Sequence, residues 1–448
     1  DGSLNTLSDR PGMDSQKTNS YGIKIFHSFD GFEFQSFTSS TDTDVIFSYD
    51  ADWGNADSHF PYVYDYFSET FRDRKSFNQE FRAVSDSANF LKDSFLEWVI
   101  GANYLELKET NLKKDDGLYG DPSDPYGPYA SASSSSSRYK SSNFSVFGNL
   151  DYLLSASLKF SIGLRWEDWE ADYSDSLDES FNPADKMSGG KISLIKSMTN
   201  ETNIYASLAK GYKQGGFNLG LGLDANSTNQ NLAYDPEFLT NYELGINTKL
   251  LDSKINFNGV IFYSYREDQQ VLISTQTDPS DPNTFSFLTQ NAAEGVNHGL
   301  EINMDIDIRE SLSAFLNLGM LKTEIKNWQS RQDLEGRAQA HAPEKSYALG
   351  LNWAPTSHTY LAIDFTGKSS FYYSDSHNNK SKSYVLTNLN LGYVKNNWSY
   401  ELWARNVFDE YYSVRGFYFG NEAPNFIDTL YERHGDPRNI GFSIRYDF

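Results

Sequence analysis

Cysteine is absent from this chain of 448 residues, which excludes a disulfide framework, a thiolate metal site and a cysteine nucleophile. No run of 18 consecutive apolar residues occurs, so the sequence predicts no membrane-spanning helix. The seven histidines are scattered, none at metal-ligand spacing, and neither an H-E-x-x-H nor a G-x-S-x-G motif is present. We therefore expect no catalytic residue, no metal site and no cofactor, in a protein that is not an enzyme.

Positive charge is also scarce, with 38 Lys and Arg against 61 Asp and Glu and a formal net charge of −23. Binding phosphates of a nucleic acid requires a basic surface, so we expect no nucleic-acid partner. The mean hydropathy of −0.60 is typical of a soluble protein, whereas 16% aromatic residues suit a membrane barrel with aromatic girdles. Composition alone fits a soluble all-β protein and a membrane β-barrel equally well.

The last eleven residues, R-N-I-G-F-S-I-R-Y-D-F, alternate between apolar and polar side chains. Successive side chains of a strand point to opposite faces, so residues 438–448 predict a strand with one apolar and one polar face. Its length suits a tilted bilayer-crossing strand. The segments 158–167 and 300–309 show the same pattern, and no proline interrupts these strands. Several such segments in series predict a membrane β-barrel.

About 17 strands are predicted in this way. The second contains a polar stretch near Thr41 that also fits a break. Their ranges are 17–29, 32–49, 77–85, 95–107, 143–154, 157–170, 188–198, 202–212, 239–251, 254–267, 297–308, 311–324, 345–354, 358–371, 384–395, 398–408 and 438–448.

The connections alternate between short and long. We expect long loops at 51–76, 108–142, 171–187, 213–238, 268–296, 325–344, 372–383 and 409–437, with turns of a few residues between them. A soluble sandwich has no reason to place every long loop at one end, whereas outer-membrane barrels have short periplasmic turns and long extracellular loops. The alternation of short and long connections therefore favours a bacterial outer-membrane barrel whose long loops are extracellular.

The predicted strand directions conflict with closure of the barrel within this chain. Residues 17–29 and 438–448 would run in the same direction, whereas bacterial single-chain barrels close with an even number of antiparallel strands. An open edge cannot face lipid, because its N–H and C=O groups would have no partners. We therefore expect strands upstream of Asp1 to be missing, and residues 438–448 to form an exposed edge. The start at Asp1, without Met or a signal peptide, fits processing or a fragment.

Five segments resemble motifs of the TonB-dependent outer-membrane receptors. Residues 208–218 resemble the S-K-G-[YF]-K-x-G-G-F-N run, and residues 241–263 resemble the Y-E-L-G…L-L-D…F-Y hairpin. Residues 291–301 resemble N-A-G-x-A-x-x-x-G-x-E, with departures at Ala293 and Gly295. Residues 406–412 and 435–448 resemble N-L-F-D-K-x-Y and the terminal G-x-P-R…G…Y-x-F. Together these segments identify residues 77–448 as similar to a receptor of the siderophore type.

The resemblance implies an all-β fold, a transmembrane antiparallel barrel of 22 strands closed by an N-terminal plug. We expect residues 1–448 to be the C-terminal part of that barrel, with about 17 of the 22 strands and without the plug domain. The implied function is import of a scarce extracellular solute, foremost a ferric siderophore, energised by the TonB complex through the plug. Outer-membrane lipid and lipopolysaccharide are further implied partners. A passive porin, or uptake of haem, cobalamin or oligosaccharide, are the alternatives.

Two groups of candidate ligand residues lie on predicted strands. Lys210, Tyr212, Lys213 and Gln214 end a strand externally and suit a cationic and aromatic lip for an anionic ferric chelate. The same residues also fit a structural turn, because Gly215 and Gly216 follow them. The second group, which is predicted to face the lumen beside Glu167 or Glu401, fits either a solute path or charge pairs that fill the lumen. It comprises Arg165, Trp403 and Arg405.

Candidate residues in loops are aromatic or acidic. Arg415, Phe417, Tyr418 and Phe419 suit a lid over the ligand, although aromatic residues also lie at membrane interfaces. The sequence D-P-S-D-P occurs at 121–125 and again at 278–282. Its carboxylates suit calcium, but Asp and Pro are ordinary turn residues, so we expect plain turns.

Overall fold

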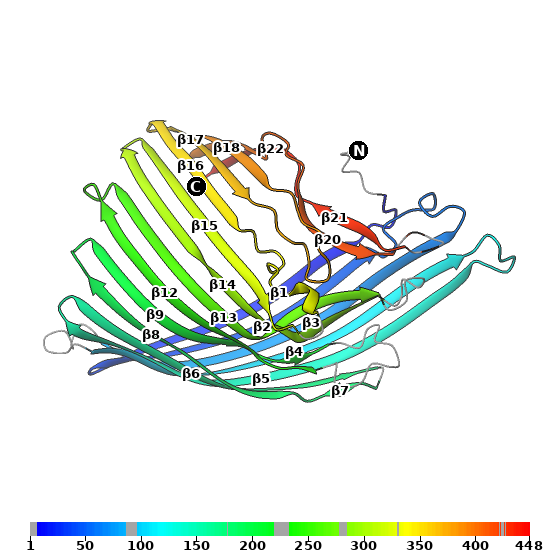
Figure 1. Cartoon of the computed structure of the whole chain (residues 1–448), viewed down its shortest axis with the longest axis horizontal. Coiled ribbons are helices and arrows are strands. Elements are labelled where there is room, and N and C mark those ends of the chain that lie inside the picture. Colours follow the sequence, from blue (N-terminus) through cyan, green and yellow to red (C-terminus); the bar gives the residue numbers. More distant parts are fainter. Residues whose placement is uncertain are drawn as a thin grey trace.

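The computed structural model describes residues 7–86, 96–176, 178–218, 233–276, 285–328, 331–420, 422, 425 and 427–448. Over these residues the chain forms one large, curved antiparallel sheet with two small hairpins beside it (Figure 1). The described segments contain no helix with the length and apolar character that crossing a membrane requires. The predicted all-β class is therefore confirmed.

The main sheet has 18 strands in the described part of the chain, and all but the two-residue strand β7 (Ser180–Phe181) are long. The long strands correspond one to one to the 17 predicted ranges. They are β1 (Met13–Phe29), β2 (Phe32–Asp50), β3 (Val63–Ser85), β4 (Leu96–Gly120), β5 (Tyr129–Ser155), β6 (Leu158–Asp175), β8 (Ala184–Ser197), β9 (Thr202–Lys213), β12 (Glu237–Leu250), β13 (Ile255–Gln276), β14 (Phe285–Arg309), β15 (Leu312–Lys326), β16 (Lys345–Thr356), β17 (Thr359–Lys368), β18 (Tyr384–Lys395), β19 (Trp398–Arg405) and β22 (Asn439–Tyr446).

Each long strand pairs antiparallel with the next long strand of the chain, as in a barrel wall. The remaining neighbours follow the same rule as far as the C-terminus. The turns at one end are short, and Gly31 (φ 87°) supplies the left-handed conformation that the β1–β2 turn requires. Two hairpins lie outside the wall: β10 (Gly216–Phe217) with β11 (Ala233–Tyr234), and β20 (Ser413–Phe419) with β21 (Thr429–His434).

Alternation along the strands places apolar side chains on the outer face and polar ones in the lumen. On β5, Phe144, Val146 and Leu150 are exposed on the outer face, whereas Ser145 is fully buried on the inner face. Exposed aromatic residues mark both ends of this apolar band, as the composition predicted. The upper girdle, on the long-loop side, contains Tyr21, Phe77, Tyr104, Phe144, Trp166, Tyr242 and Tyr263. The lower girdle contains Tyr152, Trp353, Tyr393, Trp398 and Tyr446.

Four of the expected long loops are wrong, because strands continue through them. In 171–187, β6 continues to Asp175 and β8 begins at Ala184. β3 begins at Val63, inside the expected loop 51–76. β4 continues to Gly120 and β5 begins at Tyr129, both inside the expected loop 108–142. Similarly, β13 continues to Gln276 and β14 begins at Phe285, both inside the expected loop 268–296. Beyond the membrane both faces meet water, so the apolar alternation disappears while the backbone ladder continues unbroken. The serine run 133–137 lies inside β5 for this reason, and β2 continues through Thr41 without a break.

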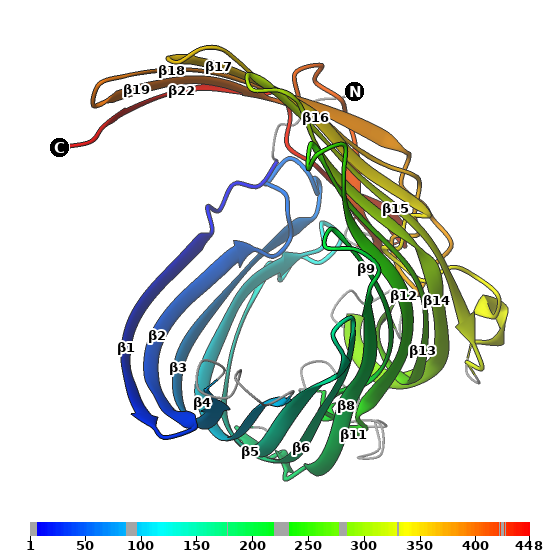
Figure 2. The same cartoon turned by 90° about the vertical axis from the view of Figure 1, so that its left-hand side faces the viewer.

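The first and last strands of the wall are edges. In the described part of the chain, β1 pairs only with β2, and β22 pairs only with β19. Figure 2 shows β22 and its neighbours standing apart from β1 across an open side of the sheet. The expectation that residues 438–448 form an exposed edge is confirmed. The existence of strands upstream of Asp1 stays a prediction.

The apolar core lies at the long-loop end and not inside the wall. Among the described residues, three separate clusters of buried side chains occur there, because the lumen is polar and the outer apolar face meets lipid. One contains Val271, Ile325, Trp328 and Leu334, the last from a short 3₁₀ helix, Gln332–Leu334. The others contain Trp169, Ala171 and Met187, and Phe371, Tyr373 and Tyr384. The external segments are therefore packed against one another.

Candidate ligand site at the external mouth

Four segments meet at the long-loop end and enclose a cavity of about 340 Å³, which we call the mouth pocket. Its walls come from β13, from the β15–β16 and β17–β18 connections and from β20 (Figure 1). The lining residues are Gln269, Gln270, Val271, Leu272, Ala340, His341, Tyr373, Ser374, Asp375, Arg415, Gly416 and Phe417. Two of the predicted ligand residues, Arg415 and Phe417, thus line one cavity.

A buried ion pair holds two of these segments together. The Arg337 guanidinium lies 2.7 Å from a carboxylate oxygen of Asp375, and the two side chains are only 8% and 13% exposed. Arg337 also donates hydrogen bonds to the carbonyl oxygens of Ser374 and His377. Its guanidinium lies 4.4 Å from the ring centroid of Tyr372. The β15–β16 connection is therefore fastened to the β17–β18 connection below the pocket.

The charges that remain at the mouth pocket are positive. Asp375 is neutralised by Arg337, whereas the exposed Arg415 forms no salt bridge with the described residues. Burial lowers the pKa of His341, and the nearby charge of Arg415 lowers it further, against the opposing effect of Asp375. His341 is therefore uncharged at neutral pH, and Arg415 carries the net charge of the pocket. A cation beside amide and aromatic groups is suited to an anionic ligand.

The predicted lid residues of β20 are packed, two of them against the first external loop. The Trp53 ring lies 5.6 Å from Phe417 and 5.1 Å from Phe419, centroid to centroid, and 5.4 Å from Tyr431 on the paired strand. We call these four rings the loop clasp. It joins the β2–β3 loop to the β20–β21 hairpin, although the wall strands β1 and β22 below are not paired.

Tyr418 points to the opposite face of β20. Its hydroxyl donates to the side-chain oxygen of Asn379 at 3.3 Å, and its ring lies 5.1 Å from the His377 ring. The backbone N–H of Asn379 donates a hydrogen bond to Nδ1 of His377. Nε2 of the same ring lies 3.3 Å from the Gly416 carbonyl oxygen. Tyr418 is thus engaged in holding the hairpin on the β17–β18 connection.

Arg165 and Tyr212 meet inside the lumen. The Arg165 guanidinium lies 2.7 Å from Glu167, and the Tyr212 hydroxyl donates to the same carboxylate oxygen at 3.1 Å. Tyr212 also packs on the buried cluster of Trp169, Ala171 and Met187. The two predicted residues therefore form one network, in which the charge of Arg165 is already paired.

Lys210, Lys213 and Gln214 are separated from that network. Lys210 shares the outer face with Leu208, and its ammonium lies 4.9 Å from the Phe238 ring centroid at the upper girdle. Lys213 is exposed opposite Glu237 at the end of β9, and Gln214 accepts a hydrogen bond from Gln270 at its backbone oxygen. The predicted lip is thus divided between the outer wall, the lumen and the rim.

Trp403 and Arg405 face the lumen, as predicted. Leu402, which precedes Trp403, is exposed on the outer face, and the Arg405 guanidinium lies 5.4 Å from the centroid of the Trp403 ring. The Trp403 ring covers Gly441 on β22, where a β-carbon would collide with it. Glu401 accepts a hydrogen bond from Asn390. These residues lie on β19 in the wall and do not line the mouth pocket.

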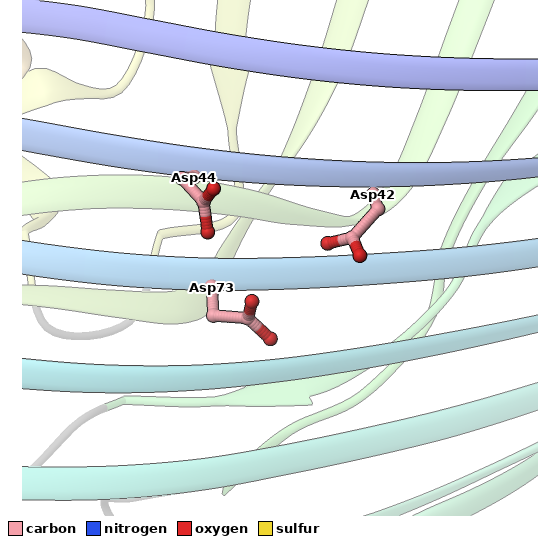
Figure 3. A group of neighbouring side chains, drawn as sticks. All are labelled: Asp42, Asp44 and Asp73. Carbon is pink, nitrogen blue, oxygen red and sulfur yellow. The ribbon is translucent and has the colours of Figure 1, made fainter.

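The acidic candidates have partners within the chain. At 121–125, Asp121 accepts two hydrogen bonds from Ser123, which lower its pKa, so the segment is a plain turn as expected. The second D-P-S-D-P, at 278–282, lies outside the described residues. Asp42, Asp44 and Asp73 form a further group on β2 and β3 (Figure 3). Lys75 lies 3.8 Å from two of them, Asp42 and Asp73.

Sequence reasoning missed His341, Gln269, Gln270, Arg337 and Asp375. Each belongs to an expected loop, and no motif distinguishes it from its neighbours. The pocket joins segments that are far apart in the sequence, so only the fold brings them together.

Comparisons with known proteins agree with this fold. The family model described as TonB dependent receptor-like, beta-barrel, matches residues 2–407. The ferric-pyoverdine 358 receptor of Pseudomonas putida is 22% identical over 375 residues, which cover 79% of this chain and 42% of that protein. This chain therefore spans less than half of that relative's length.

Two solved structures share the fold. The ferric yersiniabactin uptake receptor FyuA of Yersinia pestis has a TM-score of 0.73 at 17% identity, covering 97% of this chain and 61% of that one. The copper transporter OprC has a TM-score of 0.72 at 14% identity, covering 98% and 67%. Because the family model covers most of the chain and the observed sheet agrees with it, the chain belongs to the TonB-dependent receptor β-barrel family, whose members are outer-membrane transporters and not enzymes.

Proposed function

We propose that this chain is the barrel part of a receptor that imports a ferric siderophore across the outer membrane, energised by the TonB complex through a plug domain. The family membership supports uptake of an extracellular solute. Several proteins of the same fold are receptors for ferric chelates by name, among them those for ferric yersiniabactin and ferric preacinetobactin. The proposed ligand is an anionic chelate, because the mouth pocket carries uncompensated positive charge.

The observation that carries this proposal is the pairing pattern around Arg415. Among the described residues that line the pocket, Asp375 is the one carboxylate, and Arg337 holds it at 2.7 Å, which leaves the exposed Arg415 available to a ligand. Gln270 is held by the carbonyl oxygens of Gln214 and Asp235, so it shapes the wall. Phe417 supplies an aromatic surface beside the cation. Such a site suits a flat chelate with carboxylate or phenolate oxygens.

The alternatives differ in what they require of the site. Copper favours soft ligands, but the chain has no cysteine and the described lining of the pocket offers a single imidazole, His341, so we do not propose copper. Haem, cobalamin or oligosaccharide uptake and passive diffusion through a porin are the remaining alternatives. Three measurements distinguish these alternatives from the proposal: whether uptake depends on iron limitation, on the charge of the ligand and on TonB.

A radiolabelled uptake assay in iron-limited cells tests the proposal. We expect uptake of an anionic ferric siderophore that stops when TonB is deleted, and an amount of receptor that rises when iron is withdrawn. In Arg415→Gln, affinity for the anionic chelate should fall about 10- to 100-fold, the usual effect of losing one charge-assisted contact. An uncharged ferric chelate should be affected much less.

The matched control is Arg331→Gln, which removes a partly buried arginine that is paired with Asp333 in the β15–β16 connection and does not line the pocket. Uptake in this variant should equal that of the unmodified protein. Receptor levels that ignore iron would refute the siderophore ligand. Uptake that persists without TonB would support the porin instead.

A further inference from the structure

The β2–β3 loop contains a buried histidine beside a buried carboxylate. The side chains of His59 and Asp52 are only 4% and 3% exposed, and Nε2 of His59 lies 3.9 Å from Oδ1 of Asp52. That distance is too long for a hydrogen bond. Neither ring nitrogen of His59 has a hydrogen-bond partner among the described residues. Burying polar atoms without partners costs free energy, so a further group bound at Nε2 would stabilise the loop.

A second buried carboxylate, that of Asp50, lies two residues before Asp52. Its Oδ2 accepts hydrogen bonds from the Ser8 hydroxyl at 2.6 Å and from the backbone N–H of Asp9 at 3.2 Å. Its Oδ1 is buried and has no hydrogen-bond partner among the described residues. In the same part of the chain, Asp50 forms no salt bridge with a lysine or an arginine. One oxygen of this carboxylate is therefore open to a further ligand.

The two carboxylates lie close enough to repel each other. Burial raises the pKa of Asp52, against hydrogen bonds from two backbone N–H groups, and the nearby charge of Asp50 raises it further. A cation that contacts both carboxylates would replace this repulsion by attraction. The two carboxylates carry two negative charges and a neutral imidazole carries none. One divalent cation therefore neutralises the whole group.

A glycine keeps the space between His59 and Asp52 open. A β-carbon on Gly54 would lie 2.8 Å from Nε2 of His59 and 3.2 Å from Oδ1 of Asp52. Both side chains also line a cavity of about 130 Å³. Zinc lies about 2.1 Å from its nitrogen and carboxylate oxygen ligands, so one ion reaches both atoms across the 3.9 Å between them. A tetrahedral angle at the ion needs these atoms only about 0.5 Å closer together.

We propose that His59, Asp52 and Asp50 bind one divalent transition-metal ion, with zinc as the expected occupant. His59 contributes Nε2, and each aspartate contributes its Oδ1. Imidazole together with carboxylate suits zinc, whereas calcium and magnesium take oxygen ligands. The backbone N–H groups of Gly54 and Tyr66 donate to the Asp52 carboxylate at 2.9 and 2.7 Å. These bonds hold the carboxylate in the orientation that the ion needs.

The ion fastens the base of the loop clasp. Trp53, whose ring belongs to the clasp, lies between Asp52 and Gly54 with a φ of 58°, a left-handed conformation that is uncommon for a bulky residue. Through Asp50 the ion also holds the segment before β1. Sequence reasoning predicted no metal site, because one histidine and two aspartates in this loop match no metal-binding motif. The site lies outside the mouth pocket and does not depend on the imported solute.

Calorimetric titration with zinc tests the proposal on the full-length protein, prepared without a histidine tag and stripped of metal with EDTA. We expect one zinc ion per molecule that the double variant Asp52→Asn/His59→Gln does not bind. His59→Gln alone should weaken zinc binding about 100-fold or more, because residues that only orient a metal ligand already contribute about 10- to 100-fold. Millimolar calcium should not displace the zinc.

Gly54→Ala tests the geometry without removing a ligand. It fills the space between His59 and Asp52, so it should weaken zinc binding about as much as His59→Gln does. The new β-carbon meets first the end of the His59 side chain, which can rotate away, so the variant should fold. Hydrogen–deuterium exchange gives an independent readout. Zinc should slow amide exchange in residues 51–66 of the unmodified protein and leave it unchanged in His59→Gln.

The matched control is His27→Gln/Asp44→Asn, which removes an exposed histidine of β1 and an exposed member of the acidic group in Figure 3. It should bind zinc as tightly as the unmodified protein, and equal loss of binding in this control would overturn the proposal. Equal zinc affinity of His59→Gln and the unmodified protein would do the same. Displacement by millimolar calcium would show a site of carboxylates alone. No zinc binding by the unmodified protein would instead leave a protonated His59 as the ion-pair partner of Asp52.

Discussion

The ion pair between Arg337 and Asp375 gives the sharpest test of how the mouth is held together. Arg337→Ala removes a guanidinium that is 8% exposed and leaves the Asp375 carboxylate, 13% exposed, without its cation. The ring contact to Tyr372 and the hydrogen bonds to Ser374 and His377 disappear with it. Breaking one side of a buried pair costs about 3–5 kcal/mol, because the remaining charge is desolvated and unpaired.

Hydrogen–deuterium exchange measures this cost locally, without unfolding the wall. A loss of about 3–5 kcal/mol should accelerate amide exchange in residues 371–381 roughly 150- to 5,000-fold, wherever exchange occurs by local opening. The wall strands β16 and β17 should keep their protection. Arg331→Ala is the control: its pair with Asp333 is much less buried, at 28% and 59% exposure, and contributes about 0–1 kcal/mol, so exchange should change less than tenfold. Equal effects of the two variants would refute the role of burial in this reasoning.

Three further predictions concern the loop clasp, the mouth histidine and the wall. Trp53→Ala removes three ring contacts and should lower the free energy of opening the β20–β21 hairpin by about 2 kcal/mol. Amide exchange in the hairpin should therefore be faster. The folded pKa of His341 lies below its ordinary value of 6.5, so its contribution to mouth stability is full above pH 6.5 and lost on acidification. Exchange at pH 5 and 7.5 should show that loss, and His341→Gln should abolish it. Leu351→Arg, on the lipid face, should destabilise the barrel by about 2–4 kcal/mol in denaturant titrations, whereas Asn352→Arg on the lumen face should be nearly neutral.

Alternation of side chains allowed most of the wall to be predicted. The period of two appears wherever one face meets lipid and the other meets the lumen, as between Phe144 and Tyr152 on β5. It disappears where both faces meet water, so the external halves of β4 and β5 could not be distinguished from loops. Their backbone hydrogen bonds continue regardless of the side chains, and a serine run such as 133–137 pairs as well as any other sequence.

The mouth was predictable only in part. Arg415 and Phe417 were identified because they belong to an aromatic loop that suits a lid over the ligand. Their neighbours His341 and Asp375 come from connections whose contacts depend on barrel curvature and loop packing. Period and composition carry no information about that packing. Lys210 was expected at an external lip, and its position in the ladder puts it on the outer face, so its ligand contact stays a prediction.

The height of the mouth above the membrane determines which charges a ligand meets there. Gln269 on β13 lies six residues beyond Tyr263 of the upper girdle, about 20 Å along the strand and about 15 Å along the membrane normal. This height is nearly two Debye lengths at physiological salt. The negative potential of the lipid headgroups therefore falls to roughly one seventh of its surface value at that level. An anionic chelate that reaches the rim responds mainly to the side chains of the mouth pocket, and the charge of the membrane surface beneath it is largely screened.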